Sequence, residues 1–137
     1  MAVVIDASVA LKWALLEDGS AAARRLAATE ILAAPDLLFI ECANVLSMKV
    51  RRGLLTEADA NLAMLLIDGV PIRTVPARAR VAAAQVIAFE LRQTAYDSLY
   101  LAIALAERVE LVTADEAFAR SAMAHPLYGR SVRLLGP

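Results

Sequence analysis

Short apolar runs rich in β-branched residues alternate along the chain with longer segments of helical periodicity. The first run, residues 3–5, predicts a buried strand that ends at Asp6. The same pattern predicts four more strands, at residues 31–34, 72–75, 111–113 and 132–134, the last of them at an edge. Strands that alternate with helices favour a parallel sheet covered by helices on both faces.

The helical segments between the strands have recognisable ends. Thr56 and Thr94 are suited to cap helix N-termini, and Gly53 stands where a glycine commonly ends a helix. The helix after Thr94 extends to about residue 108 and is apolar on all sides, so we expect it to be buried, with Asp97 in its first turn. The other helices are predicted at residues 8–16, 21–29, 37–52, 57–68 and 77–91, with a short one starting at Asp115.

The composition agrees with a single folded domain over residues 1–137. Of the 137 residues, 60% are hydrophobic and 21% are charged, which excludes an intrinsically disordered chain. Ala, Leu and Val supply much of the apolar content and favour helices packed on a small buried sheet. The sequence therefore predicts one α/β domain without repeats or linkers.

The net charge limits how this chain can meet nucleic acid. A formal charge of −1 at pH 7 is unlike that of proteins that bind nucleic acid by bulk electrostatics. A role on RNA would therefore require a local basic patch or a metal ion to offset the phosphate charges.

Cysteine usage and hydropathy point to the cytoplasm. Cys42 is the single cysteine, so the chain forms no internal disulfide and fits a reducing compartment. The first residues lack the basic region of a signal peptide. The longest uncharged apolar stretches are far shorter than the roughly 20 residues of a membrane helix. We expect a cytoplasmic protein that makes no use of a membrane.

Four acidic residues stand in apolar sequence. Asp6 ends Val-Val-Ile, Glu41 lies within Leu-Leu-Phe-Ile-Glu-Cys-Ala, Asp97 opens the apolar helix, and Asp115 follows Leu-Val-Thr-Ala. An isolated ionised carboxylate in such surroundings is costly, so it is usually paired, hydrogen-bonded or bound to a metal. The other acids lie at turns, beside basic residues or on solvated helix faces.

The predicted positions bring these four acids to one place. Asp6 and Asp115 fall at the carboxyl ends of strands, where open parallel sheets bind ligands, and Glu41 and Asp97 lie near the starts of helices. All four can therefore reach one edge of the sheet. Close together, they would raise one another's pKa unless a cation offset their charge. An all-oxygen cluster without His or Cys suits Mg²⁺ or Mn²⁺ rather than zinc.

Each acid alone also has an ordinary explanation. Asp97 and Asp115 are explained equally well as first-turn or capping residues, and Asp6 as a turn residue at a strand end. Glu41 has the fewest alternatives, because no basic residue lies three or four positions away. The set is more specific than any of its members.

The four acids and their contexts resemble those of PIN-domain nucleases, specifically the VapC-type toxins of bacterial toxin–antitoxin pairs. The matching segments are Val-Val-Ile-Asp-Ala-Ser at Asp6, Ile-Glu-Cys-Ala-Asn-Val-Leu at Glu41, Tyr-Asp-Ser-Leu-Tyr-Leu-Ala at Asp97 and Val-Thr-Ala-Asp-Glu-Ala-Phe at Asp115. They occur in the family's order and span nearly the whole chain, although residues 52–77 carry no motif.

This resemblance implies a three-layer PIN-like α/β domain with a small, mainly parallel central sheet flanked by helices. It also implies a Mg²⁺- or Mn²⁺-dependent endoribonuclease that acts as a toxin, hydrolyses RNA phosphodiester bonds and is held inactive by a cognate antitoxin. Such toxins usually act as homodimers. Carried over by position, the acids of the metal and catalytic site are Asp6, Glu41, Asp97 and Asp115.

Four further polar residues are weaker candidates. Ser8 and Thr113 match residues that support the metal site in the family, while helix capping by Ser8 and an ordinary strand role for Thr113 stay open. Lys12 shares the helix face of Ser8, and Arg52 lies eleven residues after Glu41, close to the same helix face. Both are candidates for RNA contact, with solvated side chains as the alternative.

Other functions share parts of this pattern. The same acids would serve a PIN-type RNA-processing nuclease without an antitoxin, and a catalytically inert metal-binding interaction module is a further alternative. A phosphorylated receiver domain is disfavoured, because Ala7 follows Asp6 where an acidic pair is needed and no lysine follows Leu134.

Overall fold

A five-stranded sheet, parallel throughout, lies at the centre of the computed structural model, which describes all 137 residues. The strand order is β3-β2-β1-β4-β5, so the first strand is central and the last is at an edge. The strands are β1 (Ala2–Ile5), β2 (Ile31–Pro35), β3 (Ile72–Val75), β4 (Glu110–Thr113) and β5 (Val132–Leu134).

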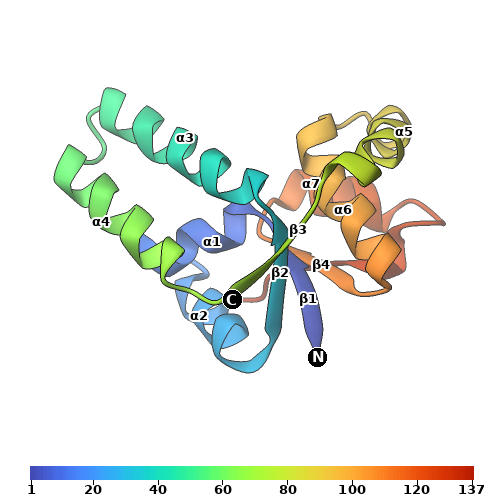
Figure 1. The fold of residues 1–137 in the computed structure, drawn as a ribbon, viewed down its shortest axis with the longest axis horizontal. Coiled ribbons are helices and arrows are strands. Elements are labelled where there is room, and N and C mark those ends of the chain that lie inside the picture. The colour runs from blue at the N-terminus through green and yellow to red at the C-terminus, as the bar shows by residue number, and fades with distance from the viewer.

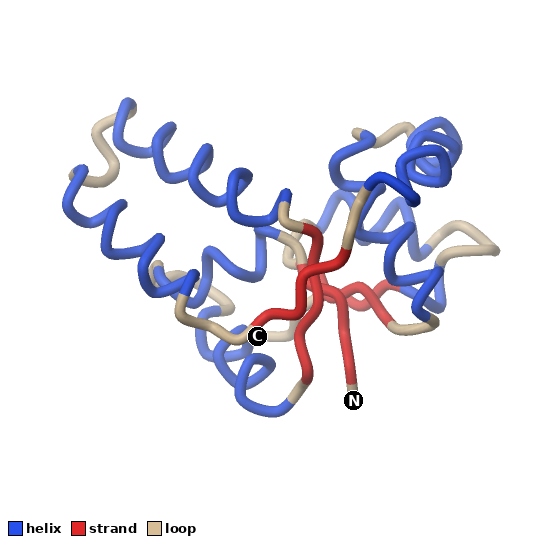
Figure 2. Tube along the Cα trace, in the orientation of Figure 1, coloured by secondary structure: helices blue, strands red, loops and turns tan.

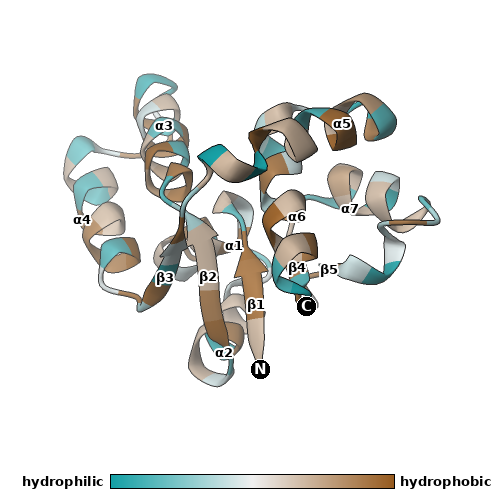
Figure 3. Cartoon of the chain, turned by 45° about the vertical axis from the view of Figure 1, so that its right-hand side comes forward, coloured by the Kyte–Doolittle hydropathy of each residue, from teal (hydrophilic) through white to brown (hydrophobic).

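The central strands are apolar because both of their faces are covered. Val4 and Ile5 of β1 are fully buried, as is Ala34 of β2, whereas Arg73 and Thr74 of the edge strand β3 are exposed. Figure 3 shows the difference as brown colour on β1. Continuous apolar runs of this kind are typical of parallel strands between two helical layers.

Seven α-helices cover the sheet in two layers. Figures 1 and 2 show α1 to α4 on one side of the strands and α5 to α7 on the other. The three-layer α/β architecture is therefore confirmed. The helices are α1 (Ala7–Ala14), α2 (Ser20–Thr29), α3 (Leu37–Arg51), α4 (Glu57–Asp68), α5 (Val81–Leu91), α6 (Ala95–Glu107) and α7 (Glu116–Met123).

Helices α3 and α4 form a hairpin that extends away from the sheet (Figure 1). Arg52 ends α3, and Gly53 follows with a φ of 73°, a conformation that glycine adopts without steric cost. The Thr56 hydroxyl accepts a hydrogen bond of 3.1 Å from the Asp59 amide and so caps α4. The start of α3 lies at the sheet and its end at the hairpin tip.

The α6 helix is buried, as its pattern predicts. Every residue from Ser98 to Ala104 is buried, and both Leu101 and Ile103 are fully enclosed. The Thr94 hydroxyl accepts a hydrogen bond of 3.0 Å from the Asp97 amide, which places Asp97 in the first turn. The helix is enclosed by the sheet and α5, and none of the chain's helices combines the length and apolarity needed to cross a bilayer.

Two details differ from the local predictions. The predicted helix over residues 77–91 begins as a separate 3₁₀ turn, Arg78–Arg80, before α5, because the chain turns sharply as it leaves β3. The first helix is capped by Asp6 rather than by Ser8, since the extended backbone of Asp6 directs its carboxylate to the Val9 amide. Trp13 belongs to the core, where its indole N–H donates to the Ala23 carbonyl at 3.0 Å.

The strand order also excludes a receiver domain. Receiver-like doubly wound sheets have the order 2-1-3-4-5, in which the third strand lies between the first and the fourth. Here β1 pairs directly with β4, and β3 is at the far edge. The neighbouring carboxyl ends of β1 and β4 thus become the place where side chains from two distant parts of the sequence meet.

Candidate active site

Two of the four candidate acids follow neighbouring strands at the carboxyl edge of the sheet. Ile5 pairs with Val112 in the β1–β4 register, so Asp6 lies beside the end of β4. Asp115 comes two residues after Thr113, where β4 ends. Glu41 stands on α3, which follows β2, and Asp97 stands in the first turn of α6.

The Asp6 carboxylate is held through both of its oxygens. The Ser8 hydroxyl donates to Oδ1 at 2.5 Å, and the Thr113 hydroxyl donates to Oδ2 at 2.5 Å. The Val9 amide adds a longer bond of 3.3 Å to Oδ1. These donors come from α1 and β4, so the Asp6 side chain joins two elements more than 100 residues apart.

Ser8 and Thr113 connect the same carboxylate to the chain that carries Asp115. The Ser8 hydroxyl oxygen accepts a bond of 2.9 Å from the Ala114 amide, and the Thr113 hydroxyl oxygen accepts one of 3.1 Å from the Asp115 amide. Thr113 is completely buried. The structure therefore places both hydroxyl residues against Asp6, as supporting residues must be.

Burial raises the pKa of Asp6 to about 6 from an ordinary value of 3.8. The hydrogen bonds from Ser8, Thr113 and Val9 act in the opposite direction, because they favour the ionised carboxylate. The negative charge of Asp97 adds a smaller contribution that raises the pKa of Asp6 again. Asp6 is therefore an acid whose ionised form is costly without a neighbouring cation.

Glu41 has a buried hydrogen-bond donor that its local sequence does not reveal. The Tyr100 hydroxyl, on α6, donates to Glu41 Oε1 at 2.5 Å, and the Tyr100 side chain is 1% exposed. Burial raises the pKa of Glu41, the Tyr100 bond lowers it, and the charge of Asp97 raises it. Burial and the adjacent Glu41 also raise the pKa of Tyr100, so its hydroxyl keeps the proton that it donates.

Asp97 connects the four acids electrostatically. Burial raises the pKa of Asp97, the hydrogen bond at Thr94 lowers it, and the charge of Asp115 raises it. The charge of Asp97 in turn contributes to the raised pKa of both Asp6 and Glu41. The charge of Asp97 thus acts on Asp6 and Glu41, and the charge of Asp115 acts on Asp97.

One oxygen of Asp115 is already engaged. Its Oδ1 accepts a bond of 3.0 Å from the Phe118 amide, which caps α7. The capping explanation and the site explanation for Asp115 are therefore compatible, because the second oxygen stays available.

The oxygen donors at this edge of the sheet leave room for a divalent cation that keeps part of its water shell. No three Asp, Glu, His or Cys side chains converge closely enough to form a complete metal-binding group by themselves. Mg²⁺ keeps several of its waters and is usually held by one or two carboxylates, so it needs no such closed group. The all-oxygen chemistry fits this mode of binding, and Asp6 and Asp97 are one of the pairs of acids whose charges interact.

A family model for the PIN domain matches residues 3–123, which is most of the chain. The chain belongs to the PIN domain family. Among solved structures, PAE2754 from Pyrobaculum aerophilum is similar, with a TM-score of 0.69 at 22% identity over 88% of this chain and 79% of the other. No curated protein matches the chain in sequence.

Two further solved structures share the architecture of this PIN domain. VapBC2 from Rickettsia felis, bound to a DNA fragment from its promoter, gives a TM-score of 0.66 at 17% identity, over 99% of this chain and 100% of the other. VapC20 from Mycobacterium tuberculosis gives a TM-score of 0.62 at 13% identity, over 87% and 94%. At such low identities the similarity concerns the fold.

Neither thiol nor imidazole chemistry is available at the acids of this PIN domain. Burial raises the pKa of the Cys42 thiol to about 12, so it stays neutral beside Glu41. His125, the one histidine, stacks on Tyr128 and contacts Glu90 at 3.2 Å, in a different part of the molecule. Carboxylates and hydroxyl groups are therefore the reactive side chains of the candidate site.

The two basic candidates have different surroundings. Lys12 donates to Glu17 at 3.2 Å and to the Asp18 carbonyl at 2.6 Å, so it stabilises the turn between α1 and α2. Lys12 also lines a pocket with Ala114 and Glu116, the neighbours of Asp115, and an RNA contact by Lys12 stays a prediction. Arg52 is exposed at the tip of the α3–α4 hairpin, about 16 Å along the helix from Glu41. An RNA contact by Arg52 stays a prediction.

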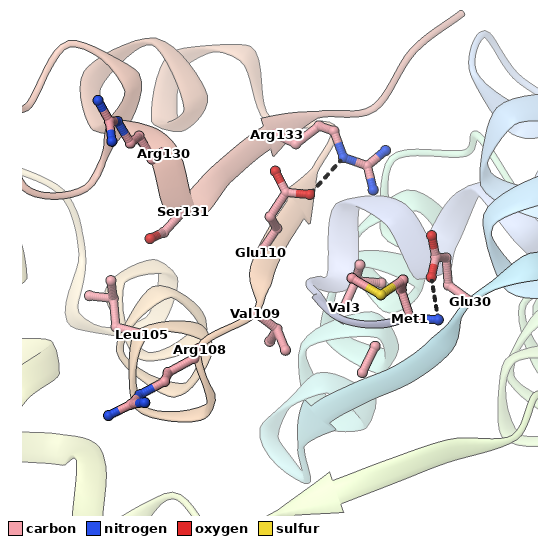
Figure 4. A pocket seen from close by; sticks show the side chains of 11 residues that line it. Met1, Val3, Glu30, Leu105, Arg108, Val109, Glu110, Arg130, Ser131 and Arg133 are labelled. Carbon is pink, nitrogen blue, oxygen red and sulfur yellow. Dashed lines mark hydrogen bonds and ion pairs between the residues drawn. The ribbon is translucent and has the colours of Figure 1, made fainter.

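One pocket of the molecule lies at the opposite edge of the sheet. It has a volume of about 680 Å³ and is lined at the amino ends of β1, β4 and β5. Figure 4 shows two ion pairs among its lining residues: Arg133 with Glu110 at 3.4 Å, and the Met1 amino group with Glu30 at 3.5 Å. None of the four candidate acids lines it, so we do not assign the reaction to this pocket.

We expect Asp6→Asn to stabilise the metal-free protein at neutral pH. The native state binds the Asp6 proton more tightly than the unfolded state, so the free energy of unfolding falls as the pH rises from 3.8 to about 6. Asparagine removes this penalty while it still accepts at the helix cap, and we expect a gain of about 1–3 kcal/mol. Urea denaturation in EDTA measures the difference, which should disappear as the pH falls toward about 4. A variant less stable than wild type at neutral pH would contradict the burial argument.

We expect Tyr100→Phe to weaken divalent-metal binding by about ten-fold, because residues that orient ligands commonly contribute this much. Without the Tyr100 donor, the pKa of Glu41 rises further, so the loss should be larger at pH 6 than at pH 8. Calorimetric titration with Mn²⁺ at both values tests this. Tyr128→Phe is the matched control, since Tyr128 donates to Glu90 at 2.9 Å outside the candidate site. Equal metal affinities for the two variants would reject a role for the Tyr100 bond.

Proposed function

We propose that this PIN domain is a Mg²⁺- or Mn²⁺-dependent endoribonuclease that acts as the toxin of a toxin–antitoxin pair. The observation that carries the proposal is a PIN domain in which Ser8 and Thr113 hold both oxygens of Asp6 beside the end of β4, and Tyr100 holds Glu41. The architecture that it shares with VapC20, a toxin that cleaves the sarcin–ricin loop, supports RNA as the substrate. The VapBC2 complex supports an antitoxin as the partner.

In this proposal the four acids have different roles, which follow from their surroundings. Asp6 and Asp97 hold the cation, and Glu41 and Asp115 complete the site directly or through water. Ser8 and Thr113 fix both oxygens of Asp6, so that the carboxylate faces the site in one orientation. Tyr100 engages Oε1 of Glu41 and leaves Oε2 available.

The reaction is the hydrolysis of a phosphodiester bond. A divalent cation held by these acids would neutralise charge at the phosphate and lower the pKa of water at the site. A water oxygen forms a new bond to phosphorus while a carboxylate of the set accepts its proton, and the bond to the leaving ribose oxygen breaks as that oxygen takes up a proton from solvent.

The antitoxin partner has a suitable surface on the α3–α4 hairpin. Ile40, Leu62, Leu65 and Leu66 expose half or more of their side-chain area on these two helices. Contiguous exposed apolar side chains commonly mark a protein-binding surface, and an amphipathic segment fits such a surface. We also propose that the protein acts as a homodimer, as the family resemblance implies, and that Arg52 contacts the RNA backbone.

Asp97→Asn should lower the rate at which single-stranded RNA is cleaved in Mg²⁺ by at least about 100-fold, because it removes a negative charge that holds the cation. Asp59→Asn is the matched control. Asp59 stands at the same position of α4, with the Thr56 hydroxyl capping its amide, but outside the site. Gel analysis of labelled RNA and Mn²⁺ calorimetry measure activity and metal binding separately.

Three results would reject the assignment. Cleavage that persists in EDTA would reject the metal dependence. Equal activity of Asp97→Asn and Asp59→Asn would reject the catalytic role of the four acids. Loss of activity without any change in Mn²⁺ affinity would separate Asp97 from the metal.

The toxin role is tested in growing bacteria. Induced wild-type protein should stop growth, whereas Asp97→Asn expressed to the same level should not, because arrest requires RNA cleavage. Coexpression of a small protein encoded beside this gene should restore growth. Undisturbed growth together with RNA cleavage in vitro would instead favour an RNA-processing nuclease without an antitoxin.

A further inference from the structure

A recess of about 320 Å³ lies between α3, α5 and α6 at the side of the candidate active site. Its walls are formed mainly by apolar side chains, and one amide interrupts them. The residues that matter for its chemistry are Leu37, Val81, Gln85, Tyr96 and Leu99.

Two of its walls come from the two helices, α3 and α6, that also carry Glu41 and Asp97. Leu37 precedes Glu41 by one turn of α3 and so lies on the same face of that helix. Tyr96 immediately precedes Asp97 in the first turn of α6. The recess and two of the candidate acids therefore share the helices α3 and α6.

The chemistry of the walls suits a flat heterocycle. Tyr96 is 63% exposed although it is aromatic, and Val81 is 55% exposed. Aromatic side chains stack on unpaired bases, and Gln85 offers an amide that both donates and accepts at a base edge. No charged side chain lines the recess. It therefore favours an uncharged ring over a phosphate.

Positive charge lies directly beside the recess. Arg78 and Arg80 are exposed in the 3₁₀ turn that ends at Val81, and none of the ion pairs of the molecule uses them. Guanidinium groups in this position complement the phosphates that flank a bound base. An apolar ring site bordered by arginines on one side and metal-binding carboxylates on the other matches one nucleotide unit of a single strand.

We propose that this recess is a nucleobase subsite, which stacks one unpaired base of the RNA on Tyr96 and reads its edge with Gln85. The identity of the substrate as RNA rests on the proposed function. A base inside a duplex is stacked on its neighbours and cannot enter, so the subsite selects single-stranded segments or loops. It also gives the nuclease a base preference at one position near the bond that is cut.

The test uses short single-stranded RNAs that carry the fluorescent base 2-aminopurine at one position each, bound to the full chain in EDTA so that no cleavage occurs. Wild type should quench the fluorescence at one position more than at the others, because stacking on an aromatic ring quenches it. Tyr96→Ala should lose this difference and bind the RNA about ten-fold more weakly, while Tyr96→Phe should retain both. Gln85→Ala should keep the quenching and lose the base preference.

Phe89→Ala is the matched control. Phe89 is an aromatic residue on α5 that is 71% exposed and does not line the recess. It should leave RNA affinity and quenching unchanged.

Three outcomes would overturn the subsite: no position is quenched by wild type, Tyr96→Ala behaves as wild type, or Tyr96→Ala changes only the sedimentation of the protein from dimer to monomer. The last would assign the recess to a second copy of the chain. Base-dependent binding without cleavage in Mg²⁺ would instead reject the proposed nuclease function and leave the subsite standing. Cleavage without base-dependent quenching would reject the subsite and leave the proposed nuclease function standing.

Discussion

The repulsion among carboxylates at the carboxyl edge of the sheet is the constraint on which the other features of this protein depend. The charge of Asp97 interacts with those of the other three acids. Burial raises the pKa of Asp6, Glu41 and Asp97. A fold that holds negative charges together in partly buried positions is less stable than one that does not. Hydrogen bonds from the surrounding residues reduce this free-energy cost, and the packing of the core holds the acids in place despite it.

The packing that holds the acids in place is concentrated around α6. This helix is buried along most of its length and carries Asp97 at its start and Tyr100 one turn later. Because Leu101 and Ile103 are fully enclosed, the helix cannot shift to separate Asp97 from the other acids without opening the core. The apolar face of α6 and the polar group at its first turn are thus parts of one arrangement, in which core packing keeps the charges close.

The same edge of the sheet organises the surfaces around the site. The α3–α4 hairpin exposes apolar side chains on one side, and the recess beside Tyr96 lies on the other. A net charge of −1 means that RNA is not attracted by the molecule as a whole. In the proposed function, local features supply the attraction: a cation at the acids, exposed arginines near the recess, and stacking of a base. The proposed subsite would favour particular unpaired segments over RNA in general.

The sequence by itself determined the strands, the caps at Thr56 and Thr94, and the identity of the unusual acids. Strand and helix signals are local, since side-chain period, threonine caps and glycine ends act over a few residues, and Thr94 and Gly53 were predicted on that basis. The apolar contexts of Asp6 and Glu41 likewise mark costly charges without any knowledge of the fold.

Only the tertiary structure decided which side chains meet. Tyr100 had no signal of its own, because a tyrosine in an apolar helix is ordinary until α3 brings Glu41 against it, 59 positions away in the sequence. The split of the segment before α5 and the engagement of Lys12 by Glu17 also depend on how the chain turns between layers. These contacts join distant segments, and their geometry is fixed by layer packing and strand order, which no local pattern encodes.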